Sequence, residues 1–263
     1  MENQLGDLKI SGSGSAGGGR YNVVSISGSG KVIGDIICEK FRISGAGKVD
    51  GGITAGEFNI SGAGKVTKDI KCVIGSISGV GKIEGSVYGG NFSISGSSMI
   101  AGNFNGDEFT ISGAGKVGGR IKSTKVRILG SSYVGEGVEG EVIDIKGELK
   151  TSGMVNGDQI NIDIGGRIEI DEIGATKVTI LNKNQYVGGI LRFFIKLFRS
   201  NKHNSLVSKI IEADEIYLEN TIVDVVRGGK IVIGEGCKIK KVEYSDTLEV
   251  NSENSVIDEA IKL

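Results

Sequence analysis

The 263-residue chain contains no proline and no tryptophan, and it has only one histidine. Proline cannot donate a backbone hydrogen bond, so its absence suits a structure in which nearly every N–H pairs with a neighbouring strand. The single histidine, His203, removes most arrangements in which an imidazole activates a nucleophile or binds a metal. We therefore expect no catalytic centre, no cofactor and no metal site.

Net charge is close to zero, and cysteine and long apolar runs are also scarce. The net charge of −1 gives no bulk attraction to nucleic acid, so no nucleic-acid partner is expected. Three cysteines are an odd number and favour reduced thiols in a cytoplasmic protein. The N-terminal residues lack the charged leader and apolar core of a secretory signal. No apolar run approaches the roughly 20 residues that cross a bilayer.

What the sequence does have is a period of 17 residues. An isoleucine recurs nine times at this spacing, as Ile26, Ile43, Ile60, Ile77, Ile94, Ile111, Ile128, Ile145 and Ile162. The first six of these nine open the string Ile-Ser-Gly. Apolar residues also recur six and ten positions later and two positions earlier; Gly75 is the exception in the last column. A fixed short period of this kind is typical of a repeat architecture.

Within one repeat the apolar positions are two or four residues apart, as in Phe41-x-Ile43, which is strand spacing. Glycine-rich strings such as residues 45–47 predict corners, where glycine can adopt positive φ. One turn cannot bury its own apolar face, but stacked turns can. The sequence therefore predicts an all-β, single-stranded β-helix with turns of about 17 residues, at about 4.8 Å per turn.

The period defines the expected domains. A flexible N-terminus of residues 1–7 precedes a main rod of residues 8–185. Residues 186–207 abandon the pattern, and strand spacing returns over residues 208–250, as in Ile231-x-Ile233. Residues 251–263 are expected to form a tail or an end cap.

The interruption has the pattern of an amphipathic helix. Arg192, Lys196 and Arg199 fall within about 60° on a helical wheel, and the other side is apolar. A basic face opposite a Phe-rich face is typical of a helix that lies in a membrane surface. The alternative is a helix that packs on the rod or on a neighbouring subunit. The predicted membrane-binding residues are Ile190, Leu191, Arg192, Phe193, Phe194, Ile195, Lys196, Leu197, Phe198 and Arg199.

A column of basic residues lies five positions after the repeat isoleucine, as at Lys31 and Lys48. It could bind an anionic polymer, but acidic residues close in the turn favour a solvated, partly neutralised edge: Asp35, Asp50, Asp69 and Glu84. Lysines on an exposed ladder also discourage sideways sheet addition. A carbohydrate-active β-helix enzyme would need neighbouring carboxylates on one face, and no such cluster repeats.

The turns beginning at Ile26 and Ile77, Ile-Ser-Gly-Ser-Gly-Lys-Val and Ile-Ser-Gly-Val-Gly-Lys-Ile, resemble those of bactofilins, the polymer-forming bacterial cytoskeletal proteins. The likeness covers about residues 26–155. It implies a right-handed β-helix that polymerises end to end without nucleotide, often on the inner face of the membrane, and scaffolds cell-envelope or cell-shape proteins. This chain departs from the family in its long core, its lack of proline and its internal membrane-binding candidate.

The ends of such a solenoid expose unpaired backbone and apolar columns unless they are capped. The residues expected to carry self-assembly are Leu8, Ile10 and Val24 at the start and Leu248 and Val250 near the end. The sequence thus favours a homopolymeric scaffold that docks peripherally on an anionic membrane surface. The alternative is a discrete β-helical binding module or spacer.

Replacing Phe193, Phe194 and Phe198 with serine should release the protein from anionic liposomes, because apolar burial supplies most of the binding energy of a surface helix. Liposome co-sedimentation measures the release, and circular dichroism should show an unchanged β-sheet spectrum. If the variant unfolds or changes its oligomeric state while lipid binding is retained, the segment packs against protein instead.

Overall fold

The computed structural model describes residues 5–182 and 205–263. In this part of the chain the fold is all-β, a parallel β-solenoid of about 14 turns, which confirms the predicted fold class. The chain divides into two compact units, residues 1–126 with 130–136 and residues 127–129 with 137–263. The helix expected over residues 190–199 lies outside the described residues.

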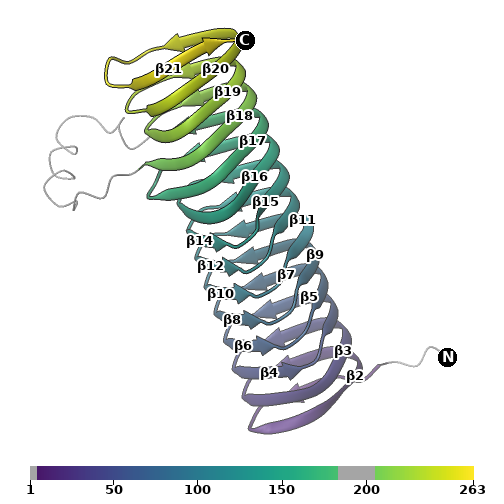
Figure 1. Cartoon of the computed structure of the whole chain (residues 1–263). Helices are drawn as coiled ribbons and strands as arrows, with labels where there is room; N and C mark the ends of the chain where they lie inside the picture. Colours follow the sequence, from purple (N-terminus) through teal and green to yellow (C-terminus); the bar gives the residue numbers. More distant parts are fainter. Residues whose placement is uncertain (1–4, 183–204) are drawn as a thin grey trace, which may run out of the picture. The chain divides into compact units, whose positions relative to one another are not determined.

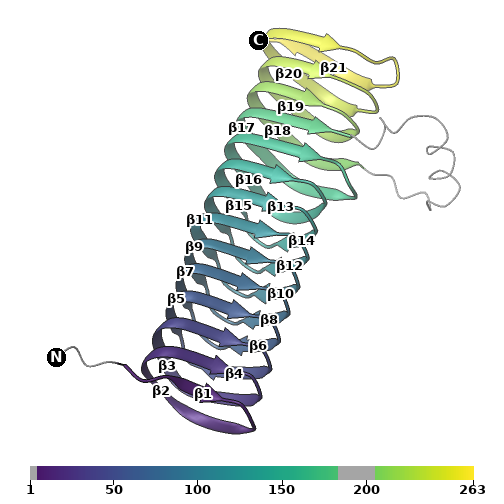
Figure 2. The ribbon, with the colours of Figure 1, turned by 180° about the vertical axis from the view of Figure 1, so that it is seen from behind.

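The first unit begins with β1 (Leu8–Ile10), β2 (Gly14–Ile26) and β3 (Ser29–Ile43). Each later turn has a short and a long strand, which form separate rows (Figures 1 and 2). The short strands are β4 (Ala46–Asp50), β6 (Ala63–Val66), β8 (Val80–Ile83), β10 (Ser97–Ile100), β12 (Ala114–Val117) and β14 (Ser131–Val134). The long strands are β5 (Ile53–Ile60), β7 (Ile70–Ile77), β9 (Val87–Ile94), β11 (Phe104–Ile111) and β13 (Ile121–Ile128).

In the second unit each turn is mostly one long bent strand. These strands are β15 (Gly137–Ile145), β16 (Glu148–Asp163), β17 (Ile168–Leu181), β18 (Leu206–Leu218), β19 (Thr221–Ile233), β20 (Lys238–Val250) and β21 (Val256–Lys262). β18 starts two residues before the expected return at residue 208 and pairs with β17 in register, so Ile180 lies beside Leu218. Residues 251–263 include β21, a further strand paired with β20.

The predicted columns form the core. All nine repeat isoleucines are at most 2% exposed, and neighbours in the column pair in the strand ladder, as Ile43 does with Ile60 and Ile145 with Ile162. Phe41 and Phe58 stack with their ring centroids 5.6 Å apart. Gly75 breaks the column because the ring of Phe92 fills the space that a side chain at Gly75 would need. Phe92 thereby stacks with Phe58 across the intervening turn, at 6.2 Å.

The reason for glycine at the corners differs from the expected one. Among the described glycines, positive φ occurs at Gly19, Gly34, Gly137 and Gly236, none of which belongs to the Ile-Ser-Gly strings. Instead, a Cβ built on Gly79 would clash with the carbonyl oxygens of Gly62 and Ser61 one turn earlier. The corners of successive turns touch through their backbones, so the motif requires glycine for space and not for an unusual dihedral angle.

A column of polar side chains replaces the ladder where the short strand gives way to the long one. Asp35 Oδ1 accepts a hydrogen bond of 2.8 Å from the Gly52 N–H, and Asp69 accepts one of 2.8 Å from Ser86. In the following turns, Ser86 Oγ accepts a hydrogen bond from the Asn103 N–H, and Asn103 Oδ1 accepts one from the Arg120 N–H. Each side chain thus satisfies a backbone N–H one turn further on, which the strand ladder would otherwise leave unpaired.

Gly79→Ala should lower the free energy of unfolding by about 1–3 kcal/mol, because the new methyl group meets backbone that cannot rotate away. Gly12→Ala is the matched control: Gly12 occupies the same motif position in the first turn, and nothing lies within 4 Å of its built Cβ. Urea denaturation of both variants measures the difference. Equal midpoints for the two variants would contradict the steric explanation.

Candidate assembly edges

The first unit has an open sheet edge at its start. Leu8 and Ile10 of β1 pair with Val24 and Ile26 of β2. In the described part of the chain, residues 14–21 of β2 pair with β3 on one side and with no strand on the other. We call β1 and residues 14–21 the N-terminal edge; Figure 2 shows β1 and β2 at this end.

The second unit has an open edge at its end. β21 pairs with residues 238–244 of β20, and residues 247–250 of β20 pair with β19 alone among the described strands. Figure 1 shows β21 as the last strand beside β20. We call β21 and residues 245–250 the C-terminal edge. Unpaired N–H and C=O groups on such strands can pair with another chain.

Four of the five residues predicted for self-assembly lie on these edges. Leu8, Ile10 and Leu248 are half-buried, and Val250 is 46% exposed. Val24 is instead fully buried, because Leu8 stacks on it in the ladder and carries the solenoid one strand further toward the N-terminus. Val24 is therefore part of the core and does not lie on an open edge.

Sequence reasoning missed β21. Its first residue, Val256, is 55% exposed, and Leu263, directly after the strand, is 70% exposed. The sequence does contain a signal for this strand, because two similar segments lie 18 residues apart. Ile239 and Ile257 are each followed by two charged residues and then an apolar one. The period of 17 does not find it, because the connecting loop is one residue longer.

The two edges differ in charge. Residues 245–263 contain five acidic residues and one lysine, which is a net charge of −4. Described residues 5–23 contain Asp7, Lys9 and Arg20, which is a net charge of +1. Lys9 Nζ lies 3.1 Å from Asp7 Oδ2. The C-terminal edge is thus acidic and the N-terminal edge weakly basic.

In the first unit, pairs of lysines from the basic column share one carboxylate. Asp50 accepts from Lys31 at 2.8 Å and from Lys48 at 2.5 Å, and these hydrogen bonds hold the pKa of the Asp50 carboxyl below its usual value. Glu84 is bound in the same way by Lys65 and Lys82, at 2.8 and 3.3 Å, and its pKa is also lowered. These pairs support the partly neutralised edge. Asp35 and Asp69 bind backbone N–H groups, and Asp35 Oδ1 also lies 3.3 Å from Lys68 Nζ.

In the second unit, one surface column alternates in sign from turn to turn. Its members are Asp171, Lys209, Asp224, Lys240 and Asp258. Lys209 Nζ lies 2.7 Å from Asp171, and Lys240 Nζ lies 2.7 Å from Asp224. The hydrogen bond to Asp171 raises the pKa of Lys209, and the one to Asp224 raises that of Lys240. The last member, Asp258, lies on the C-terminal edge.

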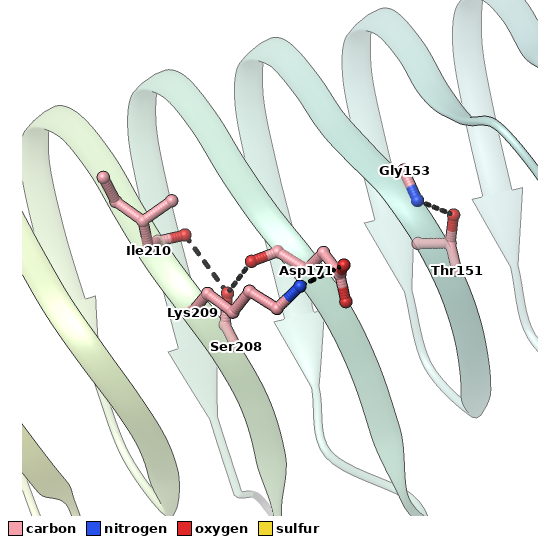
Figure 3. Close-up of polar contacts among 6 residues, drawn as sticks. All are labelled: Thr151, Gly153, Asp171, Ser208, Lys209 and Ile210. Atoms are coloured by element: carbon pink, nitrogen blue, oxygen red, sulfur yellow. Dashed lines mark hydrogen bonds and ion pairs between the residues drawn. The ribbon is translucent and has the colours of Figure 1, made fainter.

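Hydroxyl groups at the same corner bind backbone (Figure 3). The Ser208 hydroxyl lies 3.2 Å from the carbonyl oxygen of Asp171 and 3.1 Å from that of Ile210. Thr151 Oγ1 accepts a 3.1 Å hydrogen bond from the Gly153 N–H. Ser208 and Thr151 are 6% and 2% exposed, so both hydroxyls act inside the fold.

The predicted membrane-binding residues, 190–199, lie outside the described residues. The chain leaves the described part after Asn182, whose N–H donates to Glu219 at 2.9 Å. The Tyr217 hydroxyl donates to the other carboxylate oxygen of Glu219, at 2.8 Å. Glu219 is only 4% exposed, so a buried carboxylate holds the end of β17 at this point.

Over residues 5–182 and 205–263, no group of three or more His, Cys, Asp or Glu side chains has a geometry that could hold a metal ion. Within the same ranges no helix is long and apolar enough to cross a membrane.

Two curated proteins of Bacillus subtilis (strain 168) are similar to part of this chain. The uncharacterized protein YhbF is 36% identical over 94 residues, which are 36% of this chain and 34% of that protein. The uncharacterized protein YhbE is 33% identical over 91 residues, 34% of this chain and 35% of that protein. The similarity thus spans about a third of each relative's length. No family model and no solved structure matches the chain.

The three thiols should not react in the folded protein. Cys38, Cys72 and Cys237 are buried and free, and burial raises the pKa of each to about 11. At pH 8 only about 1 in 1,000 of each thiol is ionised, and the thiolate is the reactive form. Titration with a thiol reagent should give no fast reaction until denaturant is added. Rapid modification of a native thiol would contradict this.

Proposed function

We propose that this chain is a non-enzymatic scaffold that assembles end to end into a homopolymer without a nucleotide, as the resemblance to bactofilins implies. The observation that carries the proposal is the pair of open edges. Each edge combines unpaired strand backbone with partly exposed apolar residues, Leu8 and Ile10 on one and Leu248 and Val250 on the other.

Side-to-side association is the less favourable alternative. The lateral surface carries ion-paired lysines in the first unit and an alternating charge column in the second. Burying these charges against another copy would remove their hydration, whereas the edges offer apolar side chains and unpaired backbone. Contact through the edges therefore gains more free energy for the area buried.

The proposal also includes peripheral docking on the inner face of the cytoplasmic membrane through residues 190–199, where cell-envelope proteins would bind the polymer. The support is the basic and Phe-rich pattern of that segment. The segment begins and ends between two paired strands, β17 and β18, so each copy of a polymer would carry one. Repetition along a polymer would strengthen weak membrane binding through effective concentration.

Replacing both Leu8 and Ile10 with aspartate should raise the concentration needed for assembly at least about tenfold. Burying one such side chain contributes about 1.5–3 kcal/mol, and each 1.4 kcal/mol is a factor of ten. The matched control replaces two exposed apolar residues of the lateral surface, Ile37 and Val73, with aspartate. Sedimentation velocity and negative-stain microscopy measure the assembly.

The control should assemble like the unchanged protein, and all variants should keep the same circular dichroism spectrum. If the unchanged protein sediments as a monomer at every salt and protein concentration, it is a discrete module and does not polymerise. If the control alone loses assembly, the contact is lateral.

A further inference from the structure

We propose that the outer face of β10, β12 and β14 is a docking surface for an acidic, partly apolar peptide segment of a client protein. The inference rests on the proposed scaffold function and adds the place and the chemistry of client binding. The three strands lie in the row of short strands of the first unit (Figure 1). Met99, Lys116 and Tyr133 pair in register across them and form what we call the docking row.

The docking row continues the basic column but differs from it in character. The four preceding turns place a lysine at this position: Lys31, Lys48, Lys65 and Lys82. These lysines are ion-paired in twos with Asp50 and Glu84. Met99 and Tyr133 then replace lysine on either side of Lys116. Tyrosine and methionine are enriched in protein interfaces, whereas lysine is depleted, so the column changes here from paired charge to a surface suited to protein contact.

Lys116 has no carboxylate partner among the described residues. Its ammonium group lies 5.2 Å from the centre of the Tyr133 ring, a cation–π contact. The position two residues further on, which carries the shared carboxylates in earlier turns, is Gly118 in this turn and Gly135 in the next. A Cβ at either glycine would clash with a backbone oxygen one turn earlier. The stacking of the turns therefore excludes a carboxylate at this position and leaves the charge of Lys116 available to a partner.

The docking row is accessible and has the length of a short peptide. Lys116 is exposed, Tyr133 is 37% exposed and Met99 is half-buried. The residues two positions before them are small and exposed: Ser97, Ala114 and Ser131. Met99 and Tyr133 are two strand spacings apart, which is about 9.6 Å. About three residues of an extended segment cover this distance, because such a segment advances about 3.3 Å per residue.

Charge complementarity defines the partner. An acidic side chain of the segment pairs with Lys116, and an apolar side chain next to it packs on Met99 or Tyr133. An exposed ion pair alone contributes little to binding, so the apolar contact is needed as well. One copy then binds its client weakly. A polymer presents the docking row once in each copy, so a client with several such segments binds more tightly through effective concentration.

An anionic membrane surface fits this face less well. Attraction to anionic lipid grows with the number of basic residues that reach the headgroups. The neighbouring lysines of the column are already paired with Asp50 and Glu84, and these carboxylates would be repelled by such a surface. One unpaired lysine between two apolar side chains matches a short peptide segment better than an extended layer of negative charge.

Fluorescence anisotropy with labelled octapeptides tests the docking row in the full chain. The probe peptide alternates glutamate with leucine. One control peptide has serine in place of leucine, and another has lysine in place of glutamate. The protein variants are Lys116→Glu and Tyr133→Ala, with Lys48→Glu as the matched control. Lys48 lies in the same column but is paired with Asp50.

Reversing the charge of Lys116 should weaken binding of the glutamate–leucine peptide at least about tenfold, because a repulsion replaces an attraction. Tyr133→Ala should weaken it about fivefold through lost apolar contact. Lys48→Glu should change it less than about twofold, since that lysine is not part of the docking row. All three variants should sediment like the unchanged protein and keep its circular dichroism spectrum. If Lys116→Glu does not fold, Lys116→Met takes its place.

Equal losses for Lys116→Glu and Lys48→Glu would show attraction to the whole basic column and overturn the docking row. Equally tight binding of the serine or the lysine peptide would overturn the proposed chemistry. Phosphatidylglycerol vesicles that bind the protein through Lys116 when the peptide does not would identify lipid as the partner and overturn the proposal. A protein that assembles but binds no peptide removes the docking row and leaves the scaffold standing. A monomer that binds the peptide as expected keeps the docking row and removes polymerisation.

Discussion

The structure depends on the contact between backbones at stacked corners. At the Ile-Ser-Gly corners the carbonyl oxygen of one turn occupies the space where a Cβ of the next turn would lie, as at Gly79 above Gly62. This contact sets the turns at strand spacing, so that the ladder hydrogen bonds form and the isoleucine columns meet. A larger residue at this position would separate the turns and weaken both.

The fold could be predicted from the sequence because the period fixes the register. Once Ile26 and Ile43 share a column, every other residue of the turn is placed, and the buried positions follow. The physical role of the corner glycines could not be predicted in this way. Positive φ and close backbone approach both select glycine, and only coordinates separate the two reasons. The role of Gly75 likewise needed the position of the Phe92 ring.

The candidate site was only partly predictable. The period places Leu8 and Val250 at the two ends of the repeat, but only the coordinates show that Leu8 pairs with Val24 and so buries it. β21 was missed because its loop breaks the period. The difference in net charge between the two ends can be counted from the sequence. The strand pairings are needed to show that these charges lie on open sheet edges. The partners of the lysine column depend on side-chain geometry, since Lys31 binds Asp50 of the next turn and not Asp35, which is closer to it in sequence.

The contacts that hold the turns together reach from each turn to its neighbours, about 17 residues along the chain. Such short loops close quickly, and the chain has no proline whose isomerisation would delay folding. During synthesis, turns can therefore stack in the order in which they leave the ribosome, starting with the first unit. The N-terminal edge then forms long before β20 and β21 exist. A nascent chain would therefore already present a finished open edge while its own second edge is still being made.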